Sequence, residues 1–309
     1  MYRDISEKIL GRHESTTSFH VLQPQEGMRP QILQKVNQNL IFVIYVVSQL
    51  LQLMIGFSLV QQIDIITIAT QRCIITIILT LLYIQFFDNS QFQFDQGYIK
   101  VFGFMSAAQV LASLMGLLAM QTFVFSEVCT FHQLTAGYIL VLQHFLIQPT
   151  NNINLLLSLI QTISTILFSG NILYILICLL QPLSLAFIQT LKYLMTRQIQ
   201  QFSLQLYTNL IGLPLYILLS LFSGGVQNVF DMTYFIEILI MCILQMFAYL
   251  AINELVNQQL STMYIWALSG CVTILSLIVQ LGYHQVPLGF GSLSVILIVF
   301  TTIGMHRQA

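Results

Sequence analysis

Long, almost uninterrupted runs of apolar residues dominate the chain from Leu40 onward. Each run is about twenty residues long, which is the length an α-helix needs to cross roughly 30 Å of bilayer hydrocarbon. Strands of a membrane barrel would instead alternate apolar and polar positions over about ten residues. The pattern therefore predicts an all-α integral membrane protein with ten transmembrane helices. Their expected bounds are 40–60, 65–87, 98–121, 128–148, 152–169, 171–191, 204–224, 233–253, 260–281 and 289–305.

A weak internal repeat divides these ten expected helices. Residues 118–121 correspond to residues 250–253 at an offset of 132 positions, and at the same offset His132 corresponds to Tyr264. Because five helices per repeat is an odd number, the second repeat would cross the membrane inverted relative to the first. The expected organisation is a polar N-terminal tail and two inverted five-helix repeats, with bounds 1–38, 39–170 and 171–309.

The composition supports a membrane protein and argues against several other classes of protein. Hydrophobic residues make up 57% of the chain and charged residues 7%, with a mean hydropathy of +0.83, values outside the range of soluble globular domains. The five cysteines lie inside apolar runs without paired metal-ligand spacing, so neither a metal nor a cofactor is expected. A net charge of −1 gives no reason to expect nucleic acid as a partner. The chain carries no hydrolase, metalloprotease or phosphate-loop motif, so we expect neither an enzyme nor a channel.

The basic residues set the expected orientation. Lys and Arg in short loops prefer the cytosolic side, or the matrix side of a mitochondrial membrane. Nine of the ten fall on one side if the chain crosses ten times, with Lys192 placed just after the sixth span and Arg72 as the exception inside the second. Both termini are therefore expected on the cytosolic or matrix side. Arg72 would either snorkel to the surface or face the bundle interior.

The N-terminal tail, residues 1–38, holds nine of the 21 charged residues and no apolar run long enough to span a bilayer. It lacks a signal-peptide core and is too acidic for a classical presequence, so it is expected to stay uncleaved. A tail of this kind is a candidate docking segment for other subunits of a membrane complex. The Ile- and Gln-rich, Lys-poor composition is typical of an AT-rich eukaryotic genome, and the expected location is the mitochondrial inner membrane, with the ER or Golgi as the alternative.

Four short segments, in this order and spacing, resemble the drug/metabolite transporter (DMT) superfamily, which includes EamA-type permeases, nucleotide-sugar transporters and triose-phosphate translocators. They are residues 69–72, 118–130, 206–209 and 250–262. The resemblance covers roughly residues 40–305. It implies a secondary transporter that moves a small metabolite by alternating access, with its site near the membrane midplane.

The chain also departs from that family. The fourth span has no internal proline, and Gln148 stands near the usual acidic position. Relatives that carry phosphorylated sugars use Lys or Arg near the substrate, yet spans three, four, eight and nine hold no basic residue except Lys100 at one end. Phosphate is therefore disfavoured, and the expected substrate is a small neutral or zwitterionic metabolite.

The candidate functional residues are polar side chains inside the spans. They could line a substrate cavity or simply join helices by hydrogen bonds, worth about 0.6 kcal/mol each. Glu237 is either a proton-coupling carboxylate or an interfacial residue that reaches the headgroups. The cavity candidates are Gln109, His132, Gln133, Gln245 and Tyr264, and the candidate coupling charges are Arg72 and Glu237.

Two functions remain open from the sequence. The first is a secondary transporter of a small metabolite. The second is a transporter-like protein that no longer transports and serves as an accessory subunit of a large membrane complex, such as a mitochondrial respiratory assembly. The loss of family charges and the polar tail motivate the second function.

Overall fold

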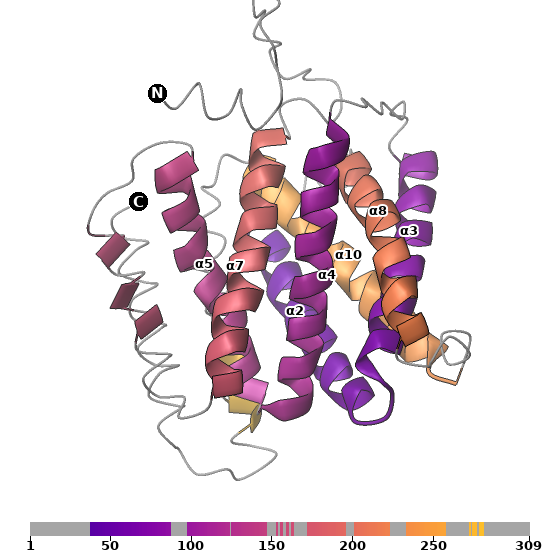
Figure 1. The fold of residues 1–309 in the computed structure, drawn as a ribbon, viewed down its shortest axis with the longest axis horizontal. Coiled ribbons are helices and arrows are strands. Elements are labelled where there is room, and N and C mark those ends of the chain that lie inside the picture. The colour runs from indigo at the N-terminus through magenta and orange to yellow at the C-terminus, as the bar shows by residue number, and fades with distance from the viewer. Residues whose placement is uncertain are drawn as a thin grey trace, which may run out of the picture.

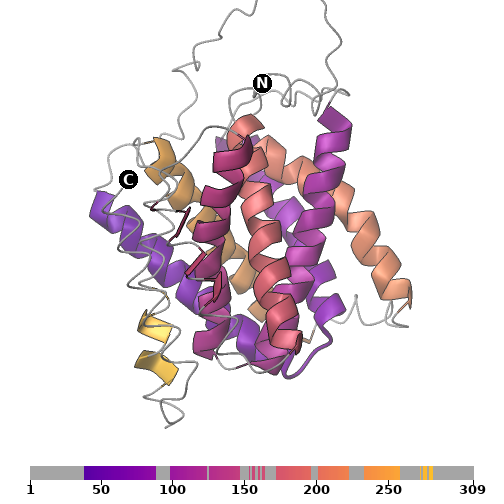
Figure 2. The ribbon, with the colours of Figure 1, turned by 60° about the vertical axis from the view of Figure 1, so that its left-hand side comes forward.

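A computed structural model describes six continuous segments of the chain and isolated positions between residues 153 and 163 and between 272 and 280. The segments contain seven helices that pack in one bundle (Figures 1 and 2). The segments are 38–87, 98–123, 125–146, 172–195, 201–222 and 233–257. The helices are α2 (Gln38–Val60), α3 (Ile65–Phe87), α4 (Ile99–Thr122), α5 (Phe125–Leu146), α7 (Ile172–Met195), α8 (Gln201–Phe222) and α10 (Phe235–Asn257). In this bundle α4 and α7 run side by side, and α10 crosses behind them obliquely (Figure 1).

Five of these helices are long and apolar enough to cross a membrane. They contain the spans Asn39–Val60, Ile65–Phe87, Ile99–Thr122, Ile175–Lys192 and Phe202–Phe222, and α10 adds the shorter apolar stretch Phe235–Ala251. The prediction of a helical integral membrane protein is therefore confirmed. Of the ten expected spans, 289–305 lies outside the described residues, and 152–169 and 260–281 are described only at isolated positions.

The outer face of α2 shows how the bundle meets lipid. Val43, Val47, Leu51 and Met54 recur every three or four residues and are all exposed, at 38–51% of their full accessible surface. Residues at this spacing lie on one side of a helix. An exposed apolar stripe of this length in an apolar helix is consistent with contact to the lipid bilayer.

The start of α3 is fixed by a side-chain cap. The Asp64 Oδ2 atom accepts hydrogen bonds from the backbone N–H groups of Ile66 and Thr67, at 3.0 and 3.2 Å. These N–H groups would otherwise have no partner in the first turn, and the carboxylate also opposes the positive end of the helix dipole. The cap therefore fixes the register of α3 and with it the position of Arg72, two turns further along.

Helices of the two predicted repeats pack against each other and do not form two separate cores. α2 packs on α10, α4 packs on α7 and α8, α3 packs on α8 and α10, and α5 packs on α7. The largest apolar cluster accordingly draws on both parts of the chain, with fully buried Ile68 and Phe131 beside Ile238.

The packing has a reciprocal pattern. The first helix of one predicted repeat contacts the third helix of the other in both directions (α2 on α10, α7 on α4), and the second helices, α3 and α8, contact each other.

Candidate functional site

A cavity of about 200 Å³ lies between the helices, and all seven contribute to its lining. Its most frequent polar group is the carboxamide, which carries both hydrogen-bond donors and an acceptor. A neutral amide is far cheaper to place among apolar helices than a charge. The lining carboxamides belong to Gln49, Gln52, Gln109, Gln181, Gln189, Gln205, Asn209 and Gln245.

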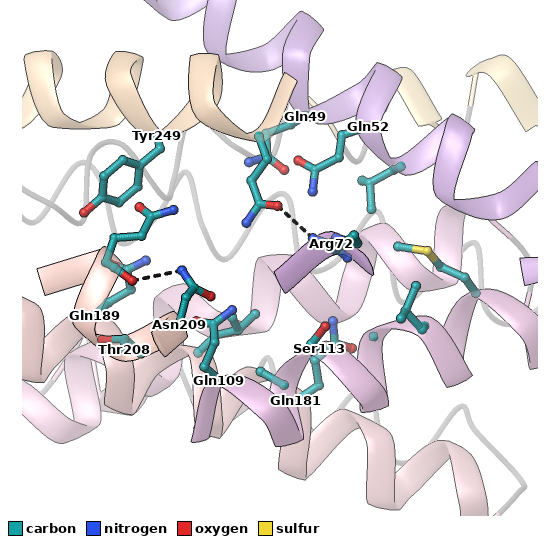
Figure 3. A pocket seen from close by; sticks show the side chains of 18 of the residues that line it. Gln49, Gln52, Arg72, Gln109, Ser113, Gln181, Gln189, Thr208, Asn209 and Tyr249 are labelled. Carbon is teal, nitrogen blue, oxygen red and sulfur yellow. Dashed lines mark hydrogen bonds between the residues drawn. The ribbon is translucent and has the colours of Figure 1, made fainter. Parts of the chain in front are cut away.

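Two walls face each other across this space (Figure 3). Gln49 and Gln52 of α2 and Tyr249 of α10 form one wall. The helices α4, α7 and α8 form the opposite wall, with side chains that include Gln109, Gln181 and Asn209. Arg72 of α3 lies between the two walls in this view.

Arg72 faces the bundle interior. Its Nη2 atom donates a hydrogen bond to Gln245 Oε1 at 3.0 Å, and its side chain lines the cavity. The Cys242 thiol donates a second hydrogen bond between these helices, to the backbone carbonyl oxygen of Arg72 at 3.8 Å. The choice between snorkelling and facing the interior is thus decided by contacts of α3 with α10.

Lys192 also lies at the cavity, which corrects its expected place just after a span ending at residue 191. The helix α7 continues to Met195, and the Lys192 Nζ atom is 4.8 Å from the centre of the Tyr249 ring, a cation–π contact. Residues 181, 189 and 192 stand at helical spacing and line the same space. This polar stripe in an apolar run was the sequence signal that Lys192 belongs to the span.

Backbone carbonyl groups of α8 accept hydrogen bonds from side chains of α8 itself and of the neighbouring helices. Asn209 Nδ2 donates to the Gln205 carbonyl oxygen at 2.9 Å, the second dashed line in Figure 3. The Cys73 thiol donates to the Asn209 carbonyl oxygen at 3.5 Å, and Ser106 Oγ lies 2.7 Å from the Thr208 carbonyl oxygen. These contacts hold α8 between α3 and α4.

The amide oxygens at the cavity that have no hydrogen-bond partner among the described residues include Gln52 Oε1 and Gln205 Oε1. The Gln205 side chain is only 6% exposed. Leaving a buried acceptor unpaired costs about 1–3 kcal/mol. A hydrogen-bond donor supplied by a molecule in the cavity would remove that cost.

The predicted candidates divide into three groups. Gln109, Gln245 and Arg72 line the cavity together. Glu237 lies exposed in the first turn of α10 and does not line it. The side chains of His132 and Gln133 and the whole of Tyr264 lie outside the described residues.

The lining residues that sequence reasoning missed include Gln49, Gln52 and Gln205. Each stands one or two turns from another lining residue on its own helix: Tyr45 precedes Gln49, and Thr208 follows Gln205. That spacing was visible in the sequence. Within the described segments no group of three or more His, Cys, Asp or Glu side chains could hold a metal ion.

No protein-family model matches this chain, and no curated protein matches it. We therefore base the proposed function on the cavity and its lining.

Proposed function

We propose that this protein is a secondary carrier that binds a small polar metabolite in the central cavity and moves it across the membrane by alternating access. The observation that carries the proposal is a cavity lined by eight carboxamides and two cations inside a bundle of apolar helices. Polar and ionisable groups within membrane helices are costly and typically mark a substrate pathway. Carrier sites typically lie between two groups of helices near the bilayer midplane.

Two features support a carrier architecture with two inverted repeats of the DMT type. The reciprocal packing of α2 on α10 and α7 on α4 is what a pseudo-twofold axis would produce. The offset of 132 positions between the similar segments 118–121 and 250–253 is what a duplicated unit would leave. With five helices in each repeat, the two units would have opposite orientations in the membrane, and the cavity would lie at their interface.

In this proposal, alternating access is a movement of the wall formed by α2 and α10 against the wall formed by α4, α7 and α8. Lys192 and Tyr249 join α7 to α10 across that boundary. Arg72 of α3 is bonded to Gln245 of α10, while Cys73 of α3 is bonded to α8. α3 therefore couples the two walls.

The experiment that tests the proposal is uptake of radiolabelled solutes into liposomes that contain the purified protein. The panel holds neutral, zwitterionic and anionic metabolites, and protein-free liposomes give the background. We expect saturable uptake of at least one solute, reduced about tenfold or more by Gln109→Leu. The matched control is Phe104→Leu on the outer face of α4, where the side chain is 68% exposed. Uptake that equals the background for the whole panel would contradict the carrier function.

The accessory-subunit function is the competing outcome. Mild-detergent extraction from native membranes, followed by native gel electrophoresis, separates the two and identifies the membrane. Comigration with a large complex at fixed stoichiometry, lost on deletion of residues 1–30, would replace the carrier by a subunit docked through its N-terminal tail. Migration alone or as a small oligomer supports the carrier.

A further inference from the structure

Among the residues that the structure describes, the cavity carries positive charge that no acidic side chain compensates. Arg72 and Lys192 both line it, whereas the described lining residues include neither Asp nor Glu. A charge among apolar helices is costly unless an opposite charge or strong hydrogen bonds compensate it. Arg72 has the amide oxygen of Gln245 as an acceptor, and Lys192 has the face of an aromatic ring. Both contacts are with neutral groups, so the two positive charges remain.

The two cations reach neighbouring turns of one helix. Arg72 contacts Gln245, and Lys192 contacts Tyr249, four residues further along α10. Four residues of helix rise about 6 Å. The cavity therefore offers two separated positive charges, each in contact with α10. Two separated charges fit a molecule with a negative charge at each end better than a compact dianion such as phosphate, whose charge surrounds a single atom.

The expectation of a neutral or zwitterionic substrate rested on four spans that lack basic residues. The countercharge instead comes from α3 and α7, which belong to other spans. The guanidinium of Arg72 uses one N–H for Gln245 and has a planar set of further donors that matches a carboxylate. The physical objection to a negatively charged ligand therefore does not apply at this cavity.

Size and hydrogen bonding restrict the ligand further. An apolar cavity of about 150 Å³ holds one benzene molecule, so a cavity of about 200 Å³ has room for roughly eight non-hydrogen atoms. A four-carbon dicarboxylate has about that size. The unpaired Gln205 Oε1 atom, and that of Gln52, would accept hydrogen bonds from hydroxyl groups on the same molecule.

We propose that the cavity binds a small dicarboxylate, with one carboxylate on Arg72, the other on Lys192, and any hydroxyl groups on the amides of Gln205 and Gln52. This inference deepens the proposed function, because it names the charge class of the solute. Binding neutralises both cations and leaves the bundle without a net charge at the cavity.

The test is equilibrium competition for radiolabelled malate on the full-length protein in lipid nanodiscs, with no gradient across any membrane. Unlabelled succinate is compared with succinamide, its neutral counterpart of nearly equal shape, and with inorganic phosphate. We expect succinate to compete at least about a hundredfold better than succinamide, because succinamide cannot form the two charge pairs with Arg72 and Lys192. Malate should bind about fivefold tighter than succinate, and Gln205→Leu should abolish that difference.

Charge-removing variants locate the two ends of the ligand. Arg72→Gln and Lys192→Met should each lower succinate affinity tenfold or more and bring it close to that of propionate, which has one carboxylate. The matched control is Lys100→Met, because Lys100 is exposed in the first turn of α4 and does not line the cavity. If Arg72→Gln fails to fold, Gln245→Glu keeps the contact to Arg72 while neutralising its charge, and should lower affinity likewise.

Several results would overturn the inference. They are a folded protein that binds neither malate nor succinate, succinamide that competes as well as succinate, phosphate that competes better than either acid, and charge variants that match Lys100→Met. Failure of the carrier function is separately visible. Malate binding without liposome uptake would reject transport and keep the dicarboxylate site. Uptake of a neutral solute without malate binding would keep transport and reject the dicarboxylate site.

Discussion

The two cationic ends of the cavity are built from different kinds of contact. At the Arg72 end (Arg72, Gln245 and Cys242), α3 and α10 are joined by a directional hydrogen bond of 3.0 Å and by a thiol contact to the backbone. At the Lys192 end (Lys192, Tyr249 and Phe202), the contacts are a cation above a ring and an edge-to-face ring pair with centres 5.4 Å apart. The hydrogen bond at the Arg72 end depends on the angle between donor and acceptor, whereas the ring contacts at the Lys192 end depend mainly on distance.

This difference indicates where the cavity opens more easily. A hydrogen bond weakens steeply when its geometry changes, whereas ring and cation–π contacts tolerate sliding. We therefore expect the Arg72 end to act as the fixed point and the Lys192 end as the part that opens. Two substitutions test this difference and two more test the wall of α4, α7 and α8 that faces it, in order of decreasing expected effect.

Gln245→Leu should break the Arg72 end. It removes the amide oxygen that accepts from Arg72 and leaves a cation facing an apolar side chain. Hydrogen bonds to charged groups are worth about 1.5–3 kcal/mol, so the free energy of unfolding should fall by about 2 kcal/mol in mixed detergent–SDS micelles. Gln245→Glu keeps an acceptor and should match the wild type or exceed it. Equal stability of the Leu and Glu variants would show that this bond does not fix the Arg72 end.

Tyr249→Leu should weaken the Lys192 end by less. It removes the ring below Lys192 and the edge contact with Phe202, together worth about 1–2 kcal/mol. Tyr249→Phe keeps both ring contacts and serves as the control. Limited proteolysis at the C-terminal end of α7 should be faster in the Leu variant and unchanged in the Phe variant. A Leu variant as unstable as Gln245→Leu would contradict the contrast between the two ends.

The sequence predicted the membrane helices well because their apolar runs are long and continuous. The expected bounds 65–87 coincide with α3, and the Asp64 cap is itself readable from the sequence. The end of α7 was placed too early because Lys192 was taken as a loop marker, although a long side chain near a helix end can also point inward. A positively charged residue near the end of an apolar run does not by itself show whether its side chain points into the loop or into the bundle.

The candidate site was predictable only in part. Gln109, Gln245 and Arg72 stood out as polar residues in apolar spans, and they meet at the cavity. Gln205 did not stand out, because it lies near the start of α8 beside other polar residues. The contact between Arg72 and Gln245 joins residues 173 positions apart. Such a pairing depends on which helices pack together, and the apolar pattern of a single helix does not encode its neighbours.

Gly116→Ala should disturb the cavity wall without touching either cation. A Cβ atom added at Gly116 would lie 3.0 Å from Gln181 Nε2, so the lining amide must shift. Gly103→Ala on the same helix meets nothing within 4 Å and should gain about 0.5–1 kcal/mol in helix stability. We expect Gly116→Ala to be about 1 kcal/mol less stable than Gly103→Ala and to bind malate more weakly. Identical behaviour of the two variants would mean that Gln181 moves freely and that α4 and α7 are not closely fitted.

Ser106→Ala should have the smallest effect, because it alters a contact within one wall. Ser106 Oγ lies 2.7 Å from the carbonyl oxygens of both Phe102 and Thr208, and only the second contact joins α4 to α8. Interhelical hydrogen bonds of this kind average about 0.6 kcal/mol in membrane proteins, and the loss in unfolding free energy should be of that size. Thr122→Ala is the matched control, since the Thr122 hydroxyl bonds only to its own helix at Leu118. In the proposed carrier movement the wall of α4, α7 and α8 moves as one unit past α10, so malate affinity should stay unchanged in both variants. A loss of affinity confined to Ser106→Ala would show that α4 and α8 move separately, and the boundary of the moving part would then lie inside that wall.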